Sequence, residues 1–262
     1  MTDLGSHLAQ MRATAPLVQN ITNFVSMNVM ANALLAAGAS PAMVHAREEA
    51  ADFAGIAQAL NVNIGTLSPD WVHGMTAAAA VMQGAGKPWV LDPVAAGATA
   101  HRADACARLI ALSPTIIRGN ASEIMALVGA GGAGKGADAA DSVASAEAAA
   151  TLLAKRTGAV VAVTGPVDFV TDGTEAWRVM NGHPMMPKVT ALGCSLSAIT
   201  AAFAVGQAAL PATVAALAYY GLAGERAGAR ADGPGSFAVQ FIDALAAVTP
   251  DDLTAHGRVA RA

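Results

Sequence analysis

Charged and aromatic side chains are scarce in this chain of 262 residues, at 13% and 4% of the sequence. The net charge at pH 7 is −4, and lysine and arginine form no run. Proteins that bind nucleic acids or anionic membrane surfaces usually carry such basic clusters. We therefore expect neither as a partner.

Cysteine is rarer still. The two cysteines, Cys106 and Cys194, lie far apart and show no CxxC or Cys/His spacing, so we expect no structural zinc site. The first residues, MTDLGSHLAQMRATAP, lack the apolar segment of a secretory signal. The reducing cytoplasm is the expected location.

No charged residue occurs between positions 194 and 224, a stretch long enough to span a bilayer on length alone. However, polar residues are scattered through the stretch, and GQAALP at 206–211 divides it. This pattern predicts two buried helices joined by a turn, and no membrane span.

Apolar residues make up 54% of the sequence, much of them alanine, which suits helices that pack closely on a flat sheet. Short β-type runs alternate with helical runs, which is typical of an α/β fold with a mainly parallel sheet between two helical layers. The predicted strands cover residues 16–21, 39–44, 61–66, 88–94, 114–120 and 158–165. The predicted helices between them cover 25–38, 48–60, 70–86, 103–112, 121–129 and 144–158.

The pattern changes after residue 165. Residues 167–182 predict a hairpin with its turn at Asp172-Gly173, and helices follow at 194–208, 212–229 and 234–247. The glycine-rich residues 129–142 predict a loop. No linker or break in composition occurs, so we expect a single domain over residues 1–262.

Ligands of such sheets bind at the carboxyl ends of the strands. Arg118 ends one strand, where we expect it to be exposed and to bind a phosphate. Asn120 and Glu123 fit a helix-capping arrangement, or Glu123 helps to organise a hydrated Mg²⁺. Asp92 ends another strand, either as a turn former or as a second acid for the metal.

The sequence offers two candidate anion sites. GAGGAGKG at 129–136 resembles a phosphate-binding loop, but Gly136 replaces the hydroxyl residue and the loop follows a helix, so we interpret it as a connection. A helix starting at Gly193 or Cys194 leaves the backbone N–H groups from Ala191 to Ser195 free for a phosphate or oxyanion. A core helix that begins with small residues is the alternative.

Taken together, VQNITNFVSMNVMANALLAAGASPAMVHAREE, LDPVAAGAT, IRGNASEI, VTGPVDFVTDG and VTALGCSLSAITAAF resemble the hydroxyethylthiazole kinase family. The resemblance implies a three-layer, ribokinase-like α/β fold without a lid domain. It implies ATP- and Mg²⁺-dependent phosphorylation of the primary alcohol of 4-methyl-5-(2-hydroxyethyl)thiazole, in thiamine biosynthesis or salvage. It also implies a homotrimer with active sites between subunits.

The resemblance also assigns residues. Met43 and Ala191 fall at the substrate, Arg118 and Thr164 at ATP, and the pair Asn120 and Glu123 near Mg²⁺ and phosphate. The chain departs from the family at residues 191–194, which read Ala-Leu-Gly-Cys where the family has Gly-Thr-Gly-Cys or Gly-Ala-Gly-Cys. We expect Ala191 to exclude the dihedral angles that only glycine adopts freely.

Cys194 stands where relatives across the ribokinase-like fold typically carry an aspartate that accepts the proton of the substrate hydroxyl. We expect Cys194 to be this proton acceptor, with its thiol pKa lowered by the helix N-terminus. A cysteine hydrolase is an alternative and requires a histidine, His45 or His183, within reach of the thiol. The other alternative is a protein that binds a nucleotide or a thiazole without turnover.

Overall fold

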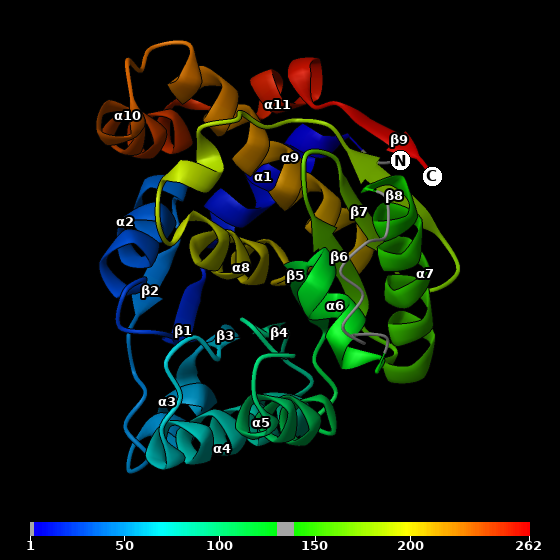
Figure 1. Cartoon of the computed structure of the whole chain (residues 1–262). Helices are drawn as coiled ribbons and strands as arrows, with labels where there is room; N and C mark the ends of the chain where they lie inside the picture. Colours follow the sequence, from blue (N-terminus) through cyan, green and yellow to red (C-terminus); the bar gives the residue numbers. More distant parts are fainter. Residues whose placement is uncertain (1–2, 130–138) are drawn as a thin grey trace.

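A computed structural model describes residues 3–129 and 139–262, and the strands of these residues form one nine-stranded sheet (Figure 1). The strand order is β2-β1-β3-β4-β5-β6-β7-β8-β9. The strands are β1 (Leu17–Ile21), β2 (Ser40–Ala42), β3 (Ala59–Asn63), β4 (Trp89–Asp92), β5 (Ile116–Asn120), β6 (Val160–Thr164), β7 (Asp168–Thr171), β8 (Ala176–Val179) and β9 (Val259–Arg261).

The sheet is parallel from β2 through β6 and antiparallel from β6 through β9. This confirms the predicted mainly parallel sheet and the predicted hairpin, β7–β8. The hairpin turn forms as expected because Asp172 Oδ1 accepts the backbone N–H groups of Thr174 and Glu175, and Gly173 takes a left-handed φ of 92°.

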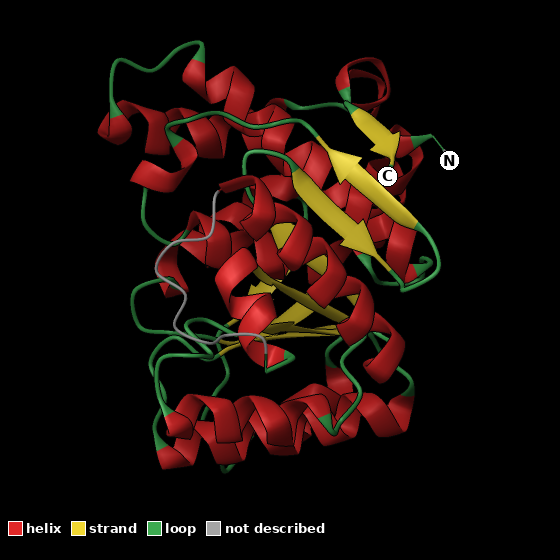
Figure 2. Cartoon of the chain, turned by 45° about the vertical axis from the view of Figure 1, so that its right-hand side comes forward, coloured by secondary structure: helices red, strands yellow, loops and turns green. Residues whose placement is uncertain are grey.

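Helices cover both faces of the sheet and complete three layers (Figure 2). One apolar core packs the sheet against α1 (Leu4–Thr14), α2 (Met27–Ala37), α8 (Leu192–Phe203), α9 (Ala209–Gly228), α10 (Pro234–Ala247) and α11 (Pro250–His256). The other packs it against α3 (Ala50–Ile56), α4 (Pro69–Ala85), α5 (Ala100–Ile110), α6 (Ala121–Leu127) and α7 (Ala139–Thr157). A short 3₁₀ helix, η1 (Met186–Lys188), precedes α8.

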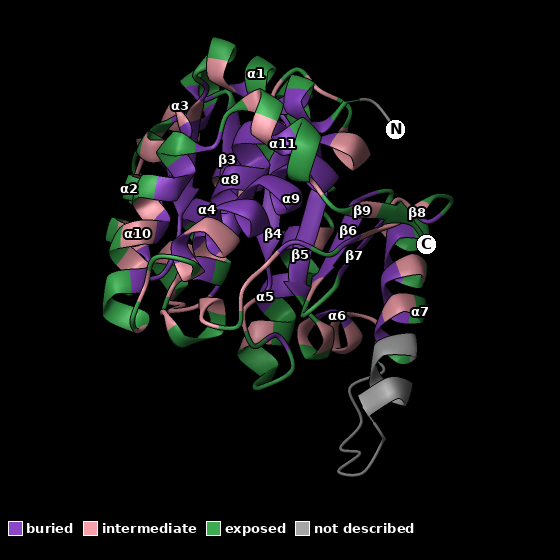
Figure 3. Cartoon of the chain, turned by 90° about the horizontal axis from the view of Figure 1, so that it is seen from above, coloured by how far each residue is buried: buried purple, intermediate pink, exposed green. Residues whose placement is uncertain are grey.

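Helices α8 and α9 are buried almost along their whole length, as the colouring by burial shows (Figure 3). Ala198, Ala201 and Ala202 on α8 are fully buried, and α8 contacts β1, β3 and β4. Side chains this small let the helix axis approach the sheet closely. The predicted close packing of alanine-rich helices is therefore confirmed.

The uncharged stretch divides as predicted, since α8 ends at Phe203 and α9 begins at Ala209. Pro211 lies in the first turn of α9, where its missing N–H costs no helical hydrogen bond. Within the described residues no helix is both long enough and apolar enough to cross a bilayer.

Several predicted boundaries were wrong. The predicted helix over 48–60 ends at Ile56, because residues 59–63 form β3. The predicted loop over 129–142 is too long, because α7 begins at Ala139; residues 130–138 of the glycine-rich segment lie outside the described residues. The elements α1, α11 and β9 at the two ends of the chain were not predicted.

Candidate active site

Polar side chains gather at the carboxyl edge of the parallel strands. Asn23 follows β1, and β3, β4 and β6 end at Asn63, Asp92 and Thr164. Arg118 is the third residue of β5. Because these strands are neighbours, the side chains form a continuous row, as the sequence analysis expected for ligand-binding strand ends.

The first turn of α8 faces this row. The helix begins at Leu192, and the Ser195 N–H donates to the Ala191 carbonyl at 2.9 Å. The prediction that Ser195 offers a free N–H was wrong, because the helix starts at Leu192, before the expected Gly193 or Cys194. The N–H groups of Leu192, Gly193 and Cys194 occupy the positions that lack an intrahelical acceptor, so this turn is suited to an anion.

Ala191, the residue before this turn, has φ 66° and ψ 0°. The expectation that alanine cannot take this left-handed conformation was wrong: the chain adopts it with a Cβ present. For a residue other than glycine, this conformation costs roughly 1–2 kcal/mol. The backbone path of the turn is therefore kept despite the missing glycine.

Two buried side chains hold the start of α8. Arg118 donates from Nη1 to the Gly193 carbonyl at 3.1 Å and from Nη2 to Thr164 Oγ1 at 2.7 Å. The Tyr220 hydroxyl, on α9, donates to the Leu192 carbonyl at 2.7 Å. The prediction of an exposed Arg118 was wrong: the residue is only 9% exposed, because it bridges the sheet and the helix.

The thiol of Cys194 is partly buried and accepts a hydrogen bond from Asn23 Nδ2 at 3.4 Å. Burial and the nearby Asp92 carboxylate raise its pKa, although the hydrogen bond from Asn23 and the charge of Arg118 act in the opposite direction. The expected lowering of the thiol pKa by the helix N-terminus was therefore wrong. Desolvation outweighs the helix dipole here.

No histidine of the described residues donates to or accepts from Cys194. The His45 ring packs at a tilt against Trp71 with ring centroids 4.7 Å apart, and His183 stacks on Phe237 at 5.8 Å. The activated thiol–imidazole pair that a cysteine hydrolase requires is therefore not formed.

Asp92 and Glu123 have different surroundings. Oδ2 of Asp92 accepts from Asn63 at 2.7 Å and from Ser197 at 2.9 Å, whereas Oδ1 accepts no hydrogen bond among the described residues. Glu123 completes the predicted capping box with Asn120, and its other oxygen accepts the Ala95 N–H at 2.9 Å. The capping interpretation of Glu123 is therefore confirmed.

The two carboxylates fit a hydrated Mg²⁺. Burial, with a smaller contribution from the charge of Glu123, raises the pKa of Asp92 to about 6, and Arg118 lies 3.9 Å from its Oδ2. A cation near both carboxylates would offset the free energy that burial of the ionised Asp92 costs. In the described residues no three His, Cys, Asp or Glu side chains cluster as a metal cage.

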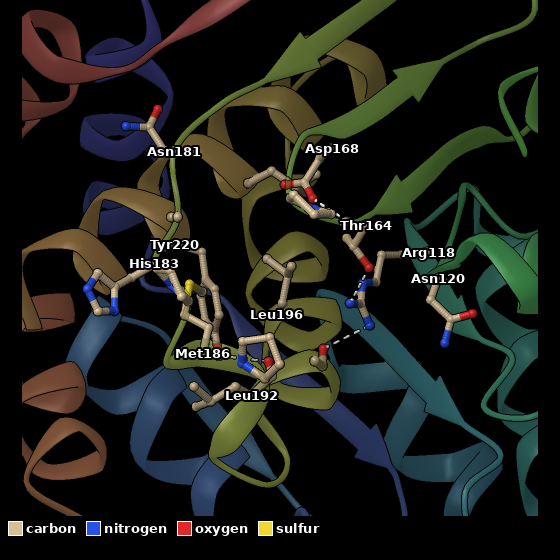
Figure 4. Close-up of a pocket in the computed structure, with 18 residues that line it drawn as sticks. Arg118, Asn120, Thr164, Asp168, Asn181, His183, Met186, Leu192, Leu196 and Tyr220 are labelled. Atoms are coloured by element: carbon tan, nitrogen blue, oxygen red, sulfur yellow. Dashed lines mark hydrogen bonds between the residues drawn. The ribbon is translucent and has the colours of Figure 1, made fainter. Parts of the chain in front are cut away.

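A cavity of about 680 Å³ extends from Arg118 and Thr164 between the hairpin, η1 and α9 (Figure 4). Its inner wall contains Leu192, Leu196 and Leu217. The sequence analysis considered His183 only as a partner of the thiol, and it missed three other polar residues in the lining, which are Asp168, Asn181 and Tyr220. Nothing in their local patterns marked them, because distant segments bring them together.

Met43 lies just beyond β2, at the outer edge of the parallel strands. It packs against the same apolar core as Cys194 but does not line the cavity. Ala191 precedes the turn that carries Cys194. The structure thus groups Arg118, Thr164 and Cys194 around α8, and it leaves Met43 on the other side of β1.

Comparison with known proteins identifies the family. The sequence model of the Hydroxyethylthiazole kinase family matches residues 8–251. The chain belongs to this family. The hydroxyethylthiazole kinase of Cereibacter sphaeroides is 68% identical over 253 residues, 97% of each chain. That of Rhizobium leguminosarum is 59% identical over 263 aligned positions, covering 100% of this chain and 98% of the relative.

Similar solved structures support the same family assignment. A structure described as a hydroxyethylthiazole kinase protein from Pyrococcus horikoshii matches with a TM-score of 0.92 at 38% identity, covering 100% of both chains. Pyridoxal kinase of Staphylococcus aureus in complex with ADP matches with a TM-score of 0.62 at 17% identity, covering 80% of this chain and 88% of that one. The latter likeness shows the fold, which is ribokinase-like. Family membership makes the protein an enzyme of the kinase class, as the sequence predicted.

The left-handed Ala191 gives a first prediction. Ala191→Gly should raise the free energy of unfolding by about 0.5–1 kcal/mol, because glycine relieves the strain but adds freedom to the unfolded chain. Equilibrium urea unfolding measures the change. Ala15, at φ 43° and ψ 54° after α1, is the matched control, and Ala15→Gly should give a similar gain. A loss of stability in Ala191→Gly alone would contradict the left-handed assignment.

The buried carboxyls give a second prediction. Burial raises the pKa of both Asp92 and Asp168 to about 6. Between about pH 4 and pH 6 the folded protein therefore holds protons that the unfolded chain has lost, so the free energy of unfolding falls as the pH rises. The fall should be on the order of 2–3 kcal/mol for each group.

Asp168→Asn removes one of these two titrating groups. In the wild type the Gly165 N–H donates to Asp168 Oδ1 at 2.9 Å, and an asparagine oxygen can still accept this bond. Urea unfolding of the ligand-free protein at pH 4, 5, 6 and 7 should show roughly half of the wild-type fall. An unchanged pH dependence in this variant would show that Asp168 titrates normally.

Proposed function

We propose that the chain catalyses ATP- and Mg²⁺-dependent phosphorylation of the primary alcohol of 4-methyl-5-(2-hydroxyethyl)thiazole, in thiamine biosynthesis or salvage. One observation carries the proposal. In a chain of this family, a buried arginine and the first turn of a buried helix, which carries Cys194, lie at one end of a cavity of about 680 Å³. Phosphoryl transfer needs such a combination of positioning and positive potential.

ATP binds in this cavity, in our proposal, with its phosphates toward α8. Arg118 and Thr164 hold the phosphates, because the guanidinium fork matches phosphate oxygens. The apolar wall of Leu192, Leu196 and Leu217 is suited to the nucleoside. A volume of this size lies in the usual range of small-molecule sites.

Asp92 and Glu123 hold water molecules of the metal, in our proposal, and do not form a dedicated cage. When bound, Mg²⁺ neutralises phosphate charge during the transfer. Asp92 contributes the oxygen that accepts no protein hydrogen bond, and Asn63 and Ser197 hold its other oxygen in place. Arg118 adds a fixed positive charge on the opposite side.

In the chemical step, the alcohol oxygen forms a bond to the γ-phosphorus while the bond to the β-phosphate oxygen breaks. ADP leaves with the bonding electrons, and the hydroxyl proton moves to Cys194 Sγ. The N–H groups of Leu192 and Gly193 stabilise the charge on the transferring group. Only the thiolate can accept the proton, so the raised thiol pKa limits the rate at neutral pH and the rate increases with pH.

The alcohol binds beside Cys194 with contacts to Met43 and to the backbone of Ala191, in our proposal. Phe24 and Val25 border this region and are 69% and 60% exposed. We further propose a homotrimer, in which a neighbouring subunit covers these apolar side chains and completes the site. The two free cysteines suit a cytoplasmic enzyme.

ADP release by purified protein tests the activity. With ATP and Mg²⁺, we expect ADP formation that depends on the thiazole alcohol and ³¹P signals of a phosphate monoester. A protein that binds the alcohol tightly without releasing ADP would be the binding protein considered from the sequence. ADP release that does not depend on the alcohol would contradict the proposed acceptor.

Variants of Cys194 test its role. We expect Cys194→Asp to retain substantial kcat, because a carboxylate is ionised at pH 7 and accepts a proton. Its kcat should also lose the increase with pH seen in the wild type. Cys194→Ala should be slower by about 10²- to 10⁴-fold but active, since the N–H groups of α8 remain.

The measurements are kcat from pH 6 to pH 9 and circular dichroism to check folding. A folded but inactive Cys194→Asp variant, together with a covalent adduct on the wild-type sulfur, would identify Cys194 as a nucleophile instead.

A further inference from the structure

We propose that Asn23 is a positioning residue for Cys194: its side-chain N–H donates to the sulfur and directs the sulfur lone pairs for proton acceptance. The proposal rests on the proposed function, because it assigns Asn23 a task in the same transfer. Asn23 lies in the β1–α2 connection and is 6% exposed, 171 positions from Cys194 along the chain. The sequence marks Asn23 only as one of the polar residues that follow the first predicted strand.

The orientation of the Asn23 amide follows from its backbone contacts. Its Oδ1 accepts the N–H of Val25 at 3.1 Å and the N–H of Ser26 at 3.0 Å. An amide turned the other way would place its NH₂ group against these two donors. The NH₂ group must therefore point away from its own loop, where it has Asn63 Oδ1 at 2.9 Å and Cys194 Sγ at 3.4 Å.

Asn63 is oriented in the same manner. Its Oδ1 accepts the Gly65 N–H at 2.9 Å as well as the Asn23 amide, so its Nδ2 must donate, and it donates to Asp92 at 2.7 Å. Asn63 and Asp92 are 0% and 1% exposed, so water does not compete for these bonds. Backbone N–H groups thus fix the direction of the whole network.

The consequence for Cys194 is that its sulfur is an acceptor toward Asn23. A thiol proton cannot lie along that direction, so it points elsewhere. The same hydrogen bond stabilises the thiolate and opposes burial and Asp92, both of which raise the thiol pKa. Asn23 therefore increases the fraction of sulfur that can accept a proton.

Among uncharged side chains, Asn63 also lowers the pKa of this thiol, with a smaller effect than Asn23. The charged groups that act on the sulfur are Asp92 on β4 and Arg118 on β5. The remaining titratable groups on elements packed against α8 are Tyr219, Tyr220, Glu225 and Arg226 on α9, Lys188 on η1, and His7 and Arg12 on α1. Burial keeps both tyrosines neutral, Glu225 pairs with Arg258, and Arg226 pairs with Asp252. Lys188 is exposed, His7 hydrogen-bonds Gln207 beyond the far end of α8, and Arg12 donates to the Ala37 carbonyl. Strands β1 and β3 and helix α2, at residues 17–21, 59–63 and 27–37, carry no titratable side chain.

Asn23→Ser separates positioning from loop structure. A serine oxygen can still accept from the N–H groups of Val25 and Ser26, but it is too short to reach the sulfur. Thr66→Ala is the matched control: Thr66 Oγ1 accepts the Phe24 N–H at 3.2 Å, so this variant loses a contact to the same loop without touching Cys194.

The first measurement is the rate of Cys194 alkylation by iodoacetamide at pH 7.5 without nucleotide or alcohol. Cys106 is buried and its pKa is raised to about 12, so alkylation reports on Cys194. We expect Asn23→Ser to react roughly tenfold more slowly than wild type, since one pKa unit is a tenfold change in thiolate. Thr66→Ala should react at the wild-type rate.

The second measurement is kcat, which should fall by a similar factor in Asn23→Ser with the KM for ATP unchanged. In a Cys194→Asp background the same substitution should change kcat much less, because the carboxylate is already ionised. Asn23→Asp keeps the loop acceptor and puts a carboxylate against the sulfur, so its alkylation should be slower still. If Asn23→Ser does not fold, the alkylation rate of Asn23→Asp tests the role of Asn23.

Wild-type alkylation rates in both Asn23→Ser and Asn23→Asp would overturn the proposal, as would an equal slowing in Thr66→Ala. Alkylation needs neither ATP nor an alcohol. A protein without kinase activity would refute the proposed function and still give a definite answer for Asn23.

Discussion

The bond between the sheet and the first turn of α8 is the interaction on which the site depends. Arg118 provides it, with one nitrogen on the Gly193 carbonyl and another on Thr164 at the end of β6. Its Nε is buried and has no hydrogen-bond partner within residues 3–129 and 139–262, and the carboxylate of Asp92 is 3.9 Å away. A buried guanidinium with so little compensation is costly, so its positive charge is available for an anion. Without it, the turn that carries Cys194 would lose its register against the strand ends.

Several energetically unfavourable features lie together in the site. Ala191 is left-handed, the carboxyls of Asp92 and Asp168 are buried, and the Cys194 thiol is desolvated. Strain and shifted pKa values of this kind cluster where proteins bind ligands and catalyse reactions. The two apolar cores on either side of the sheet provide the stability that tolerates them.

Local patterns in the sequence were sufficient for the parallel strands, because buried apolar runs followed by polar residues are visible along the chain. Arg118, Thr164 and Cys194 were found in this way and through the family resemblance. The network of Asn23 and Asn63 was not, because its direction depends on backbone N–H groups that the fold brings into place. Short elements such as β9 form only through pairing with β8, so no local signal predicts them. Burial also reversed two expectations, the exposure of Arg118 and the direction of the Cys194 pKa shift.

The central claim is that the first turn of α8 receives the transferring phosphoryl group while Cys194 faces the alcohol. A crystal structure with ADP, Mg²⁺, aluminium fluoride and the thiazole alcohol tests it most directly. The account predicts fluorides that accept hydrogen bonds from the N–H groups of Leu192 and Gly193, with the alcohol oxygen about 3–3.5 Å from Cys194 Sγ, as in a near-attack geometry. An aluminium fluoride bound away from α8, or an alcohol oxygen facing a different side chain, would contradict it.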